Sequence, residues 1–232
     1  MTRKELILLP GMMCDERLFA PQMMHLSGRF NITVPRLVHS NSMAAMAASL
    51  LQSAPPKFAL AGLSMGGILA MEVMQQAAER VTHLALIDTN PFAERDEVKA
   101  KRSPQIAKVE TGQLAAVMRD EMKPYYLTDG PDRARLLDLC LDMALTLGPD
   151  AFLAQSQALR DRPDYTSVLR RTSCPVLLLC GADDQLCPPE RHYAMAEMMP
   201  HATLKIIEGA GHMPSLEQPD TVNRALDHLL ER

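Results

Sequence analysis

The chain has 232 residues and lacks tryptophan, and only 4% of its residues are aromatic. It carries five cysteines but no C-x-x-C pair, which argues against a disulfide framework or a zinc site and favours a reducing compartment. Basic residues never run beyond two in a row and the net charge is −4, so we expect neither nucleic acid nor an anionic membrane as a partner. No apolar run approaches the roughly 18 residues of a membrane span, and the N-terminal run is too short for a signal peptide. These absences predict a cytoplasmic protein.

Apolar side chains, and methionine among them, are abundant instead. Hydrophobic residues make up 47% of the chain, charged residues 22%, and 17 residues are Met. A chain of this length and composition is typical of one globular domain of about 200 to 250 residues, with room for an insertion. Because methionine packs adaptably, we expect parts of the core or of a pocket wall to be deformable.

Six short apolar runs recur along the chain, bounded by Gly, Pro or Asp. Each run is continuous rather than alternating, which is typical of strands buried on both faces of a parallel sheet. Segments with helical spacing lie between most of them. Strand alternating with helix predicts a doubly wound α/β fold with a mostly parallel sheet of about six strands. The runs are Leu6–Leu9, Ile32–Val34, Phe58–Leu63, Leu84–Ile87, Val176–Cys180 and Leu204–Ile207.

This alternation stops between Pro91 and about Pro163. Mixed-charge helical segments there are broken by three turn signals, at Pro124, Asp129-Gly130-Pro131 and Gly148-Pro149. We interpret residues 91–163 as a helical cap inserted over one end of the sheet. Residues 1–90 and 164–232 then form the core domain.

Gly62-x-Ser64-x-Gly66 lies between a predicted strand and a predicted helix, in the segment FALAGLSMGGILAMEVM. A nucleophile elbow needs such a strained turn, and small residues two before and two after the serine relieve the crowding around it. A serine that only caps the helix is one alternative. A dinucleotide site is another, although G-x-G-x-x-G is absent. Ser64 is our candidate nucleophile, and its hydroxyl then needs a base and a carboxylate from other loops.

His212 follows the last predicted strand, in KIIEGAGHMPSLEQPD, and is our candidate base because it is expected at the same sheet edge as Ser64. Asp183 and Asp184 follow the preceding strand, and we assign Asp184 as the carboxylate that orients the base. Asp183 remains the nearer alternative, and Asp88, which ends another strand, the remoter one. The remaining histidines fall in predicted helices, at strand entries or in connectors; they are His25, His39, His83, His192, His201 and His228.

With nucleophile, acid and base in this order, the sequence resembles the α/β-hydrolase superfamily. GLSMGG resembles the elbow of that family, and G-x-x-D-x-x-x-P from Gly181 to Pro188 resembles its acid loop. G-x-G-H followed by Glu217 and Pro219 resembles its histidine loop. The spacing from Gly181 is what favours Asp184. The resemblance covers nearly the whole chain and implies that residues 91–163 are the variable cap.

The N-terminal LILLPGMMCDERLF resembles the oxyanion loop of the family, although Pro10 stands where a histidine is usual. The oxyanion donors implied are the backbone N–H groups of Met12 and Met65. We expect the substrate pocket to have apolar, deformable walls, but with 17 Met several would lie near any site by chance. The expected pocket residues are Met13, Met213, Tyr125 and Tyr126, with Met118, Met122, Met143 and Phe152 as further candidates on the cap.

The function that the resemblance implies is that of a serine hydrolase with no metal and no organic cofactor. Its small-molecule substrate would be a small to medium carboxylic ester or lactone. The same triad supports thioester, enol-lactone and carbon–carbon bond hydrolysis and cofactor-free perhydrolysis, and a non-catalytic ligand-binding protein of this fold is a further alternative. An acyl-carrier-protein substrate would favour a basic docking patch, to which Lys99, Lys101 and Arg102 could contribute. Acidic neighbours offset these charges, so we interpret the three residues as a solvated helix face. The oligomeric state stays open.

Overall fold

The computed structural model describes residues 3–38 and 40–232, and His39 lies outside the described residues. Six strands form one sheet in the order β2-β1-β3-β4-β5-β6, and each neighbouring pair is parallel. The expected parallel sheet of about six strands is therefore confirmed. The strands are β1 Lys4–Leu9, β2 Phe30–Thr33, β3 Phe58–Leu63, β4 Val81–Ile87, β5 Val176–Gly181 and β6 Thr203–Ile207.

The central strands are buried because both faces of the sheet are covered. All six residues of β3 and of β5 are buried, whereas the edge strands β2 and β6 are only partly buried. Successive side chains of a strand point to opposite faces, so Ile7 and Leu9 of β1 join one core cluster while Leu6 and Leu8 join the other. This is why the apolar runs are continuous in the sequence.

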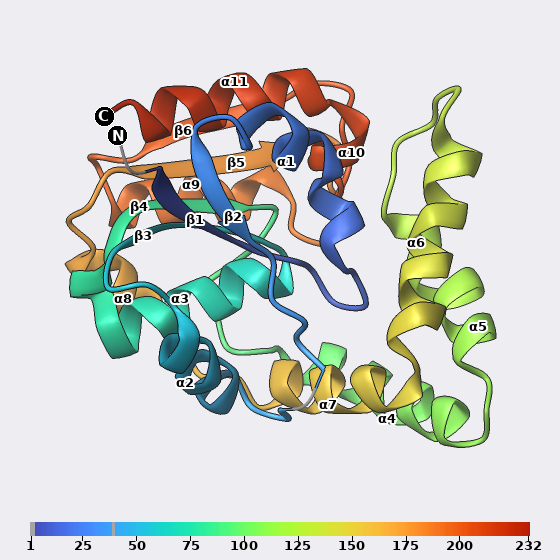
Figure 1. Cartoon of the computed structure of the whole chain (residues 1–232). Helices are drawn as coiled ribbons and strands as arrows, with labels where there is room; N and C mark the ends of the chain where they lie inside the picture. Colours follow the sequence, from blue (N-terminus) through green and yellow to red (C-terminus); the bar gives the residue numbers. More distant parts are fainter. Residues whose placement is uncertain (1–2, 39) are drawn as a thin grey trace.

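Helices cover both faces of the sheet, as a doubly wound fold requires (Figure 1). On one face lie α1 (Ala20–Leu26) and α11 (Pro219–Leu230), which pack on each other. On the other lie α2 (Met43–Ser53), α3 (Met65–Ala77), α8 (Thr166–Arg171) and α9 (Pro189–Met198). Shorter helical turns are η1 Glu16–Phe19, η2 Ala78–Arg80 and α10 Pro214–Glu217.

The stretch between β4 and α8 consists of helices that stand apart from the two layers, beyond the ends to which the strands run (Figure 1). Gly148, at φ 83°, separates α6 from α7, as the Gly148-Pro149 signal predicts. We call this stretch the α4–α7 segment. Its elements are α4 Asp96–Glu110, α5 Leu114–Ala116, the π-helix η3 Val117–Met122, the 3-10 turn η4 Lys123–Tyr125, α6 Arg133–Leu147 and α7 Pro149–Arg160.

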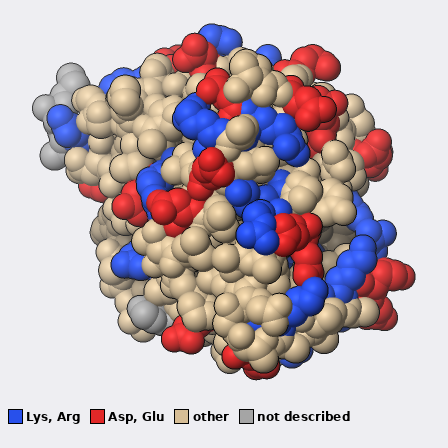
Figure 2. Space-filling view, turned by 90° about the vertical axis from the view of Figure 1, so that its right-hand side faces the viewer, with Lys and Arg blue, Asp and Glu red and all other residues tan. Residues whose placement is uncertain are grey.

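The surface seen from the side of the α4–α7 segment mixes basic and acidic side chains (Figure 2). Lys99, for example, pairs with Asp96 on the exposed side of α4, at 3.6 Å. Among the helices of the described residues, none is both long enough and apolar enough to cross a bilayer.

Candidate active site

Ser64 occupies a strained turn between β3 and α3. Its φ of 55° and ψ of −116° are unfavourable for a residue with a side chain, and its N–H donates to Ile87 O at 2.9 Å. The turn is crowded, since a Cβ on Gly62 would lie 2.2 Å from Gly66 O and one on Gly66 would lie 1.9 Å from Leu9 O. The predicted need for small residues two before and two after Ser64 therefore has a direct steric cause.

His212 connects Ser64 to Asp184. Its Nε2 lies 2.9 Å from the Ser64 hydroxyl oxygen, and its Nδ1 lies 2.8 Å from Asp184 Oδ2. Asp184 is 3% exposed and His212 is 2% exposed, while Ser64 is partly exposed. Such a relay allows the imidazole to take the serine proton while the carboxylate stabilises the imidazolium that forms.

The loop after β5 distinguishes Asp184 from its neighbour in the sequence. Asp184 Oδ1 accepts the N–H groups of Leu186 (2.8 Å) and Cys187 (3.0 Å), which holds the carboxylate toward His212. Burial alone raises the pKa of Asp184, but the His212 ring and the hydrogen bonds it receives lower it below its usual value. Asp183 is exposed, with its own N–H bound to Ala210 O.

Asp88, the third carboxylate considered from the sequence, is fully buried behind Asp184. It follows β4 with a φ of 44°, and its Oδ1 accepts Gly181 N–H at 2.9 Å. Its Oδ2 receives no hydrogen bond from the described residues. Burial and the neighbouring charge of Asp184 raise the pKa of Asp88 well above its usual value. The adjacent Thr89 N–H lies 3.4 Å from Nε2 of the buried His192, whose pKa burial lowers to about 4.

The loop after β1 provides backbone N–H groups next to Ser64. Among the described residues neither Met12 N–H nor Met65 N–H has an acceptor, whereas Met13 N–H donates to Gln155 Oε1 of α7 at 2.8 Å. A Cβ on Gly11 would lie 3.5 Å from Ser64 Cβ, so this loop runs directly past the serine. Free N–H groups at such a position can stabilise an oxyanion.

Glu217 holds the loop that carries His212. Its Oε2 accepts the N–H groups of Gly211 (2.9 Å) and Met213 (3.2 Å), the residues on either side of His212. Its Oε1 accepts the N–H of Thr128 (2.8 Å) and the Thr128 hydroxyl (3.0 Å) from the α4–α7 segment. Glu217, which with Pro219 forms part of the histidine-loop motif in the sequence, is thus a residue that supports His212.

The residues predicted for the pocket differ in their distance from His212 and in their burial. The Tyr126 ring lies 6.1 Å from the His212 ring, and Tyr126 O accepts His212 N–H at 2.8 Å. Met13 and Met213 are 0% and 2% exposed, each within a core cluster, while Tyr125 is 49% exposed. Met118, Met143 and Phe152 are likewise buried in the two clusters, and Met122 is partly buried against both.

Two arginines share one buried carboxylate where the α4–α7 segment begins and ends. Glu94 Oε1 accepts Arg102 Nη2 at 2.7 Å and Arg162 Nη1 at 2.6 Å. Arg162 Nε also donates to Phe92 O at 3.0 Å. Arg102 Nη1 lies 3.7 Å from Met12 Sδ, in the loop next to Ser64. The sequence predicts a solvated helix face for Arg102 and carries no signal of this cluster.

Two groups of potential metal ligands occur among the described residues, and both include Asp184. They are Asp184 with Cys187 and His212, and Asp88 with Cys180 and Asp184, each with its ligand atoms within 4.8 Å of one another. In both groups the carboxylates already accept hydrogen bonds: Asp184 Oδ2 lies 2.8 Å from His212 Nδ1, and Asp88 Oδ1 accepts Gly181 N–H at 2.9 Å. Burial raises the pKa of the Cys180 and Cys187 thiols.

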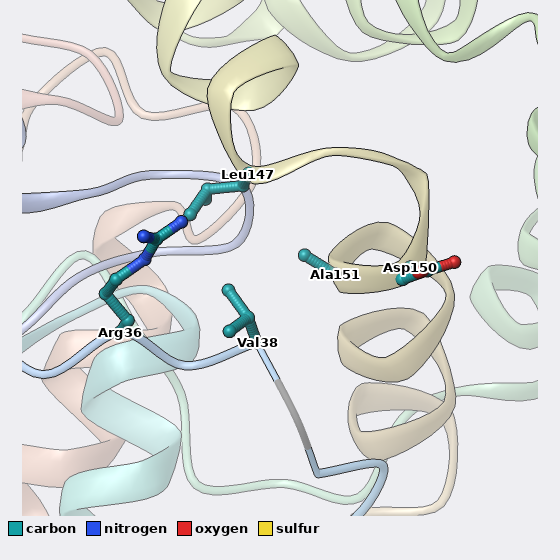
Figure 3. A pocket seen from close by; sticks show the side chains of 5 residues that line it. All are labelled: Arg36, Val38, Leu147, Asp150 and Ala151. Atoms are coloured by element: carbon teal, nitrogen blue, oxygen red, sulfur yellow. The ribbon is translucent and has the colours of Figure 1, made fainter.

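A separate surface pocket lies between the connection after β2 and the turn that joins α6 to α7 (Figure 3). Arg36 and Val38 reach toward it from one side and Leu147 and Ala151 from the other, while the Asp150 side chain points away. None of these five lining residues belongs to the Ser64–His212–Asp184 relay.

A parallel sheet with a strained serine turn and a serine–histidine–carboxylate relay at its edge defines the α/β-hydrolase class. The alpha/beta hydrolase family model matches residues 6–225, and the chain belongs to that family and is an enzyme of the hydrolase type. The resemblance seen in the sequence motifs is thereby confirmed.

Three similar proteins match nearly the whole chain. The chain is 27% identical to a pimeloyl-[acyl-carrier protein] methyl ester esterase of Aromatoleum aromaticum, with 95% of each chain covered. A solved structure of a thermophilic esterase from Thermogutta terrifontis matches with a TM-score of 0.89 and 28% identity, over 99% of this chain and 90% of that one. The enol-lactonase from Burkholderia xenovorans shares the fold, with a TM-score of 0.87 at 18% identity, over 100% and 93% of the two chains.

Proposed function

We propose that this enzyme hydrolyses small to medium carboxylic esters or lactones, with Ser64 as nucleophile, His212 as general base and Asp184 as the orienting carboxylate. The observation that carries the proposal is the unbroken relay of 2.9 Å and 2.8 Å contacts that ends at a serine on a strained turn. The names of the similar esterases and of the enol-lactonase support the same substrate class.

The reaction follows from these contacts in two halves. Ser64 Oγ attacks the carbonyl carbon while His212 Nε2 takes the hydroxyl proton, and the carbonyl oxygen becomes an oxyanion facing the N–H groups of Met12 and Met65. The C–O bond to the leaving alcohol breaks as His212 returns the proton to it. Water then attacks the acyl-enzyme, His212 takes its proton, and Ser64 leaves as the hydroxyl. Every proton is handled by His212, so no metal or organic cofactor enters the steps.

The α4–α7 segment acts in this proposal as a cap over the site, set between core parts 1–90 and 164–232. Three of its contacts support that role. Gln155 holds the Met13 N–H, Arg102 lies against Met12, and Tyr126 O holds the His212 N–H. Each contact reaches a loop that borders Ser64, so a substrate approaching Ser64 would meet side chains of this segment.

A panel of p-nitrophenyl esters of increasing acyl length, with lactones and thioesters beside it, tests the proposal. We expect the wild type to hydrolyse short or medium esters and Ser64→Ala to lose the activity while keeping its thermal midpoint. Ser167→Ala, on the short helix α8 away from the relay, is the matched control and should behave like the wild type. Turnover by Ser64→Ala at the wild-type rate would refute the assignment.

A further inference from the structure

We infer that Arg102 binds a free carboxylate of the substrate, so that the preferred esters are anionic, such as monoesters of dicarboxylic acids. The inference rests on the proposed ester hydrolysis and adds the charge of the substrate to it. Its basis is an excess of partly buried positive charge beside the loop that borders Ser64.

The charge count of the cluster leaves one positive charge without a partner. Glu94 carries one negative charge, and Arg102 and Arg162 carry two positive charges between them. The side chain of Glu94 is 2% exposed, that of Arg102 13% and that of Arg162 8%, so water and salt screen these charges weakly. The two guanidinium groups hold the pKa of Glu94 below its usual value, and no other carboxylate among the described residues bonds to either arginine. Arginine stays protonated, so the cluster keeps one net positive charge that an added anion can balance.

The hydrogen bonds of Arg102 to Glu94 leave its Nη1 group available to bind a carboxylate. Glu94 takes the side-on edge of the guanidinium, formed by Nε and Nη2. Nη1 of the end-on edge lies 3.7 Å from Met12 Sδ, and a thioether is a weak acceptor. A guanidinium edge of this kind matches the two oxygens of a carboxylate. Arg162 is different, because its donors are directed to Glu94 and to the carbonyl oxygens of Phe92 and Leu159.

Arg102 also acts electrostatically on Tyr126, a neighbour of His212. Burial raises the pKa of the Tyr126 hydroxyl well above its usual value, and the charge of Arg102 opposes that rise. The Tyr126 ring in turn lies 6.1 Å from that of His212. The guanidinium thus contacts Met12, in the loop next to Ser64, and acts electrostatically on Tyr126, next to His212. Its hydrogen bonds to the described residues do not include Ser64, His212 or Asp184 themselves, which suits a charge on the substrate away from the reacting bond.

A purely structural role does not require Arg102. Arg162 alone joins the two ends of the α4–α7 segment, through Glu94 and Phe92 O, and Tyr165 N–H adds a hydrogen bond to Pro91 O at 2.7 Å. Arg102 is therefore not needed to join the two ends of the segment, and it is the arginine whose Nη1 contacts Met12.

The test compares monomethyl and dimethyl esters of the same C4 to C7 dicarboxylic acids. For the wild type we expect kcat/KM to favour the monoester at one or two chain lengths, and high salt to raise KM for the monoester more than for the diester. Arg102→Gln should lower the monoester-to-diester ratio of kcat/KM by about 10- to 100-fold, as expected for the loss of hydrogen bonds to a charged group. Lys101→Gln, an exposed neighbour on α4, is the control and should leave the ratio unchanged.

A second measurement on the wild type covers the case in which Arg102→Gln fails to fold. Monoamides of dicarboxylic acids of the preferred length, which keep one free carboxylate, should inhibit hydrolysis of a neutral p-nitrophenyl ester competitively, and the corresponding diamides should inhibit less. A wild type that prefers the diester at every length, or an Arg102→Gln ratio equal to the wild-type ratio, overturns the inference. The proposed function itself is refuted by a different result, namely that neither the anionic monoesters nor the neutral diesters are hydrolysed.

Discussion

The carboxyl groups of Asp88 and Asp184 lie side by side in the protein interior, with an oxygen of one within 4.8 Å of an oxygen of the other. Asp184 is bound by His212 and by two backbone N–H groups, which favour its charged form. Asp88 receives one backbone N–H and leaves Oδ2 without a donor. Because two buried like charges at this separation repel, Asp88 holds the proton. The other titratable groups that face this pair are Cys180, Cys187, His192 and His212.

The raised pKa of Asp88 predicts a specific pH dependence of stability. Between the unfolded pKa of about 3.9 and the raised folded value, the folded protein keeps a proton that the unfolded chain releases. The stability contributed by Asp88 therefore falls as the pH rises through this window. The amide of the Asp88→Asn variant does not titrate, so the midpoint of this variant relative to wild type should rise from pH 5 to pH 8 in thermal unfolding. A midpoint difference that stays constant over this range would show that Asp88 is ionised.

Substitution of the three candidate carboxylates should separate their roles in activity. Asp184→Asn should lower kcat by several orders of magnitude, because an amide favours the wrong imidazole tautomer; the comparable change costs about 10⁴ in the best-studied serine protease. Asp88→Asn should retain most activity, because the amide keeps a donor toward Asp184 and an acceptor for Gly181 N–H. Asp183→Asn is the exposed control. A larger loss of kcat at Asp88 or Asp183 than at Asp184 would reverse the assignment.

Glu217 should affect both stability and activity, because it binds the N–H groups on both sides of His212. Glu217→Ala leaves buried donors unpaired at a cost of about 1 to 3 kcal/mol, and the thermal midpoint should fall by roughly 3 to 10 °C. The kcat should fall as well, since the loop no longer holds the imidazole in place. Glu208→Ala, exposed in the same connection, should change neither quantity. A lower midpoint with an unchanged kcat would limit Glu217 to a structural role.

Tyr125 and Tyr126 should respond differently to truncation. Tyr126 is 3% exposed and contacts the His212 loop, so Tyr126→Ala should lower the midpoint by several degrees. Tyr125 is 49% exposed, and Tyr125→Ala should leave the midpoint within about one degree. Hydrolysis of the ester series by both variants then checks the predicted pocket: an altered chain-length preference in Tyr125→Ala with an unchanged midpoint supports its place in the pocket, and an unaltered preference removes it.

Local patterns were sufficient to predict the strands and the positions of Ser64, His212 and Asp184. A strand buried on both faces needs a continuous apolar run, and the strained turn at Ser64 needs Gly62 and Gly66. Each of these features can therefore be recognised from residues that are adjacent in the sequence. The choice between Asp183 and Asp184 also depended on spacing within one loop. In the structure only Asp184 of these two reaches His212.

The contacts that the sequence did not reveal join residues far apart in the chain. Asp88 meets Gly181 because β4 pairs with β5, across 93 positions, and neither residue carries a local signal of that pairing. In the sequence Arg102 and Glu94 belong to a mixed-charge helical stretch with no sign of a special role. They form a partly buried cluster only because the fold brings Arg162 next to Glu94. His192 was set aside as a helical residue, yet α9 places it next to the backbone that follows Asp88.

The most direct test of the account is the site of covalent modification by a fluorophosphonate. The serine oxygen displaces fluoride from phosphorus, and the phosphonyl adduct can be located by intact-protein and peptide mass spectrometry. We expect one adduct per chain, on Ser64, with a labelling rate that falls sharply in His212→Ala and no adduct in Ser64→Ala. An adduct on another serine in the wild type, or equal labelling of wild type and Ser64→Ala, would contradict the assignment of Ser64 as the nucleophile.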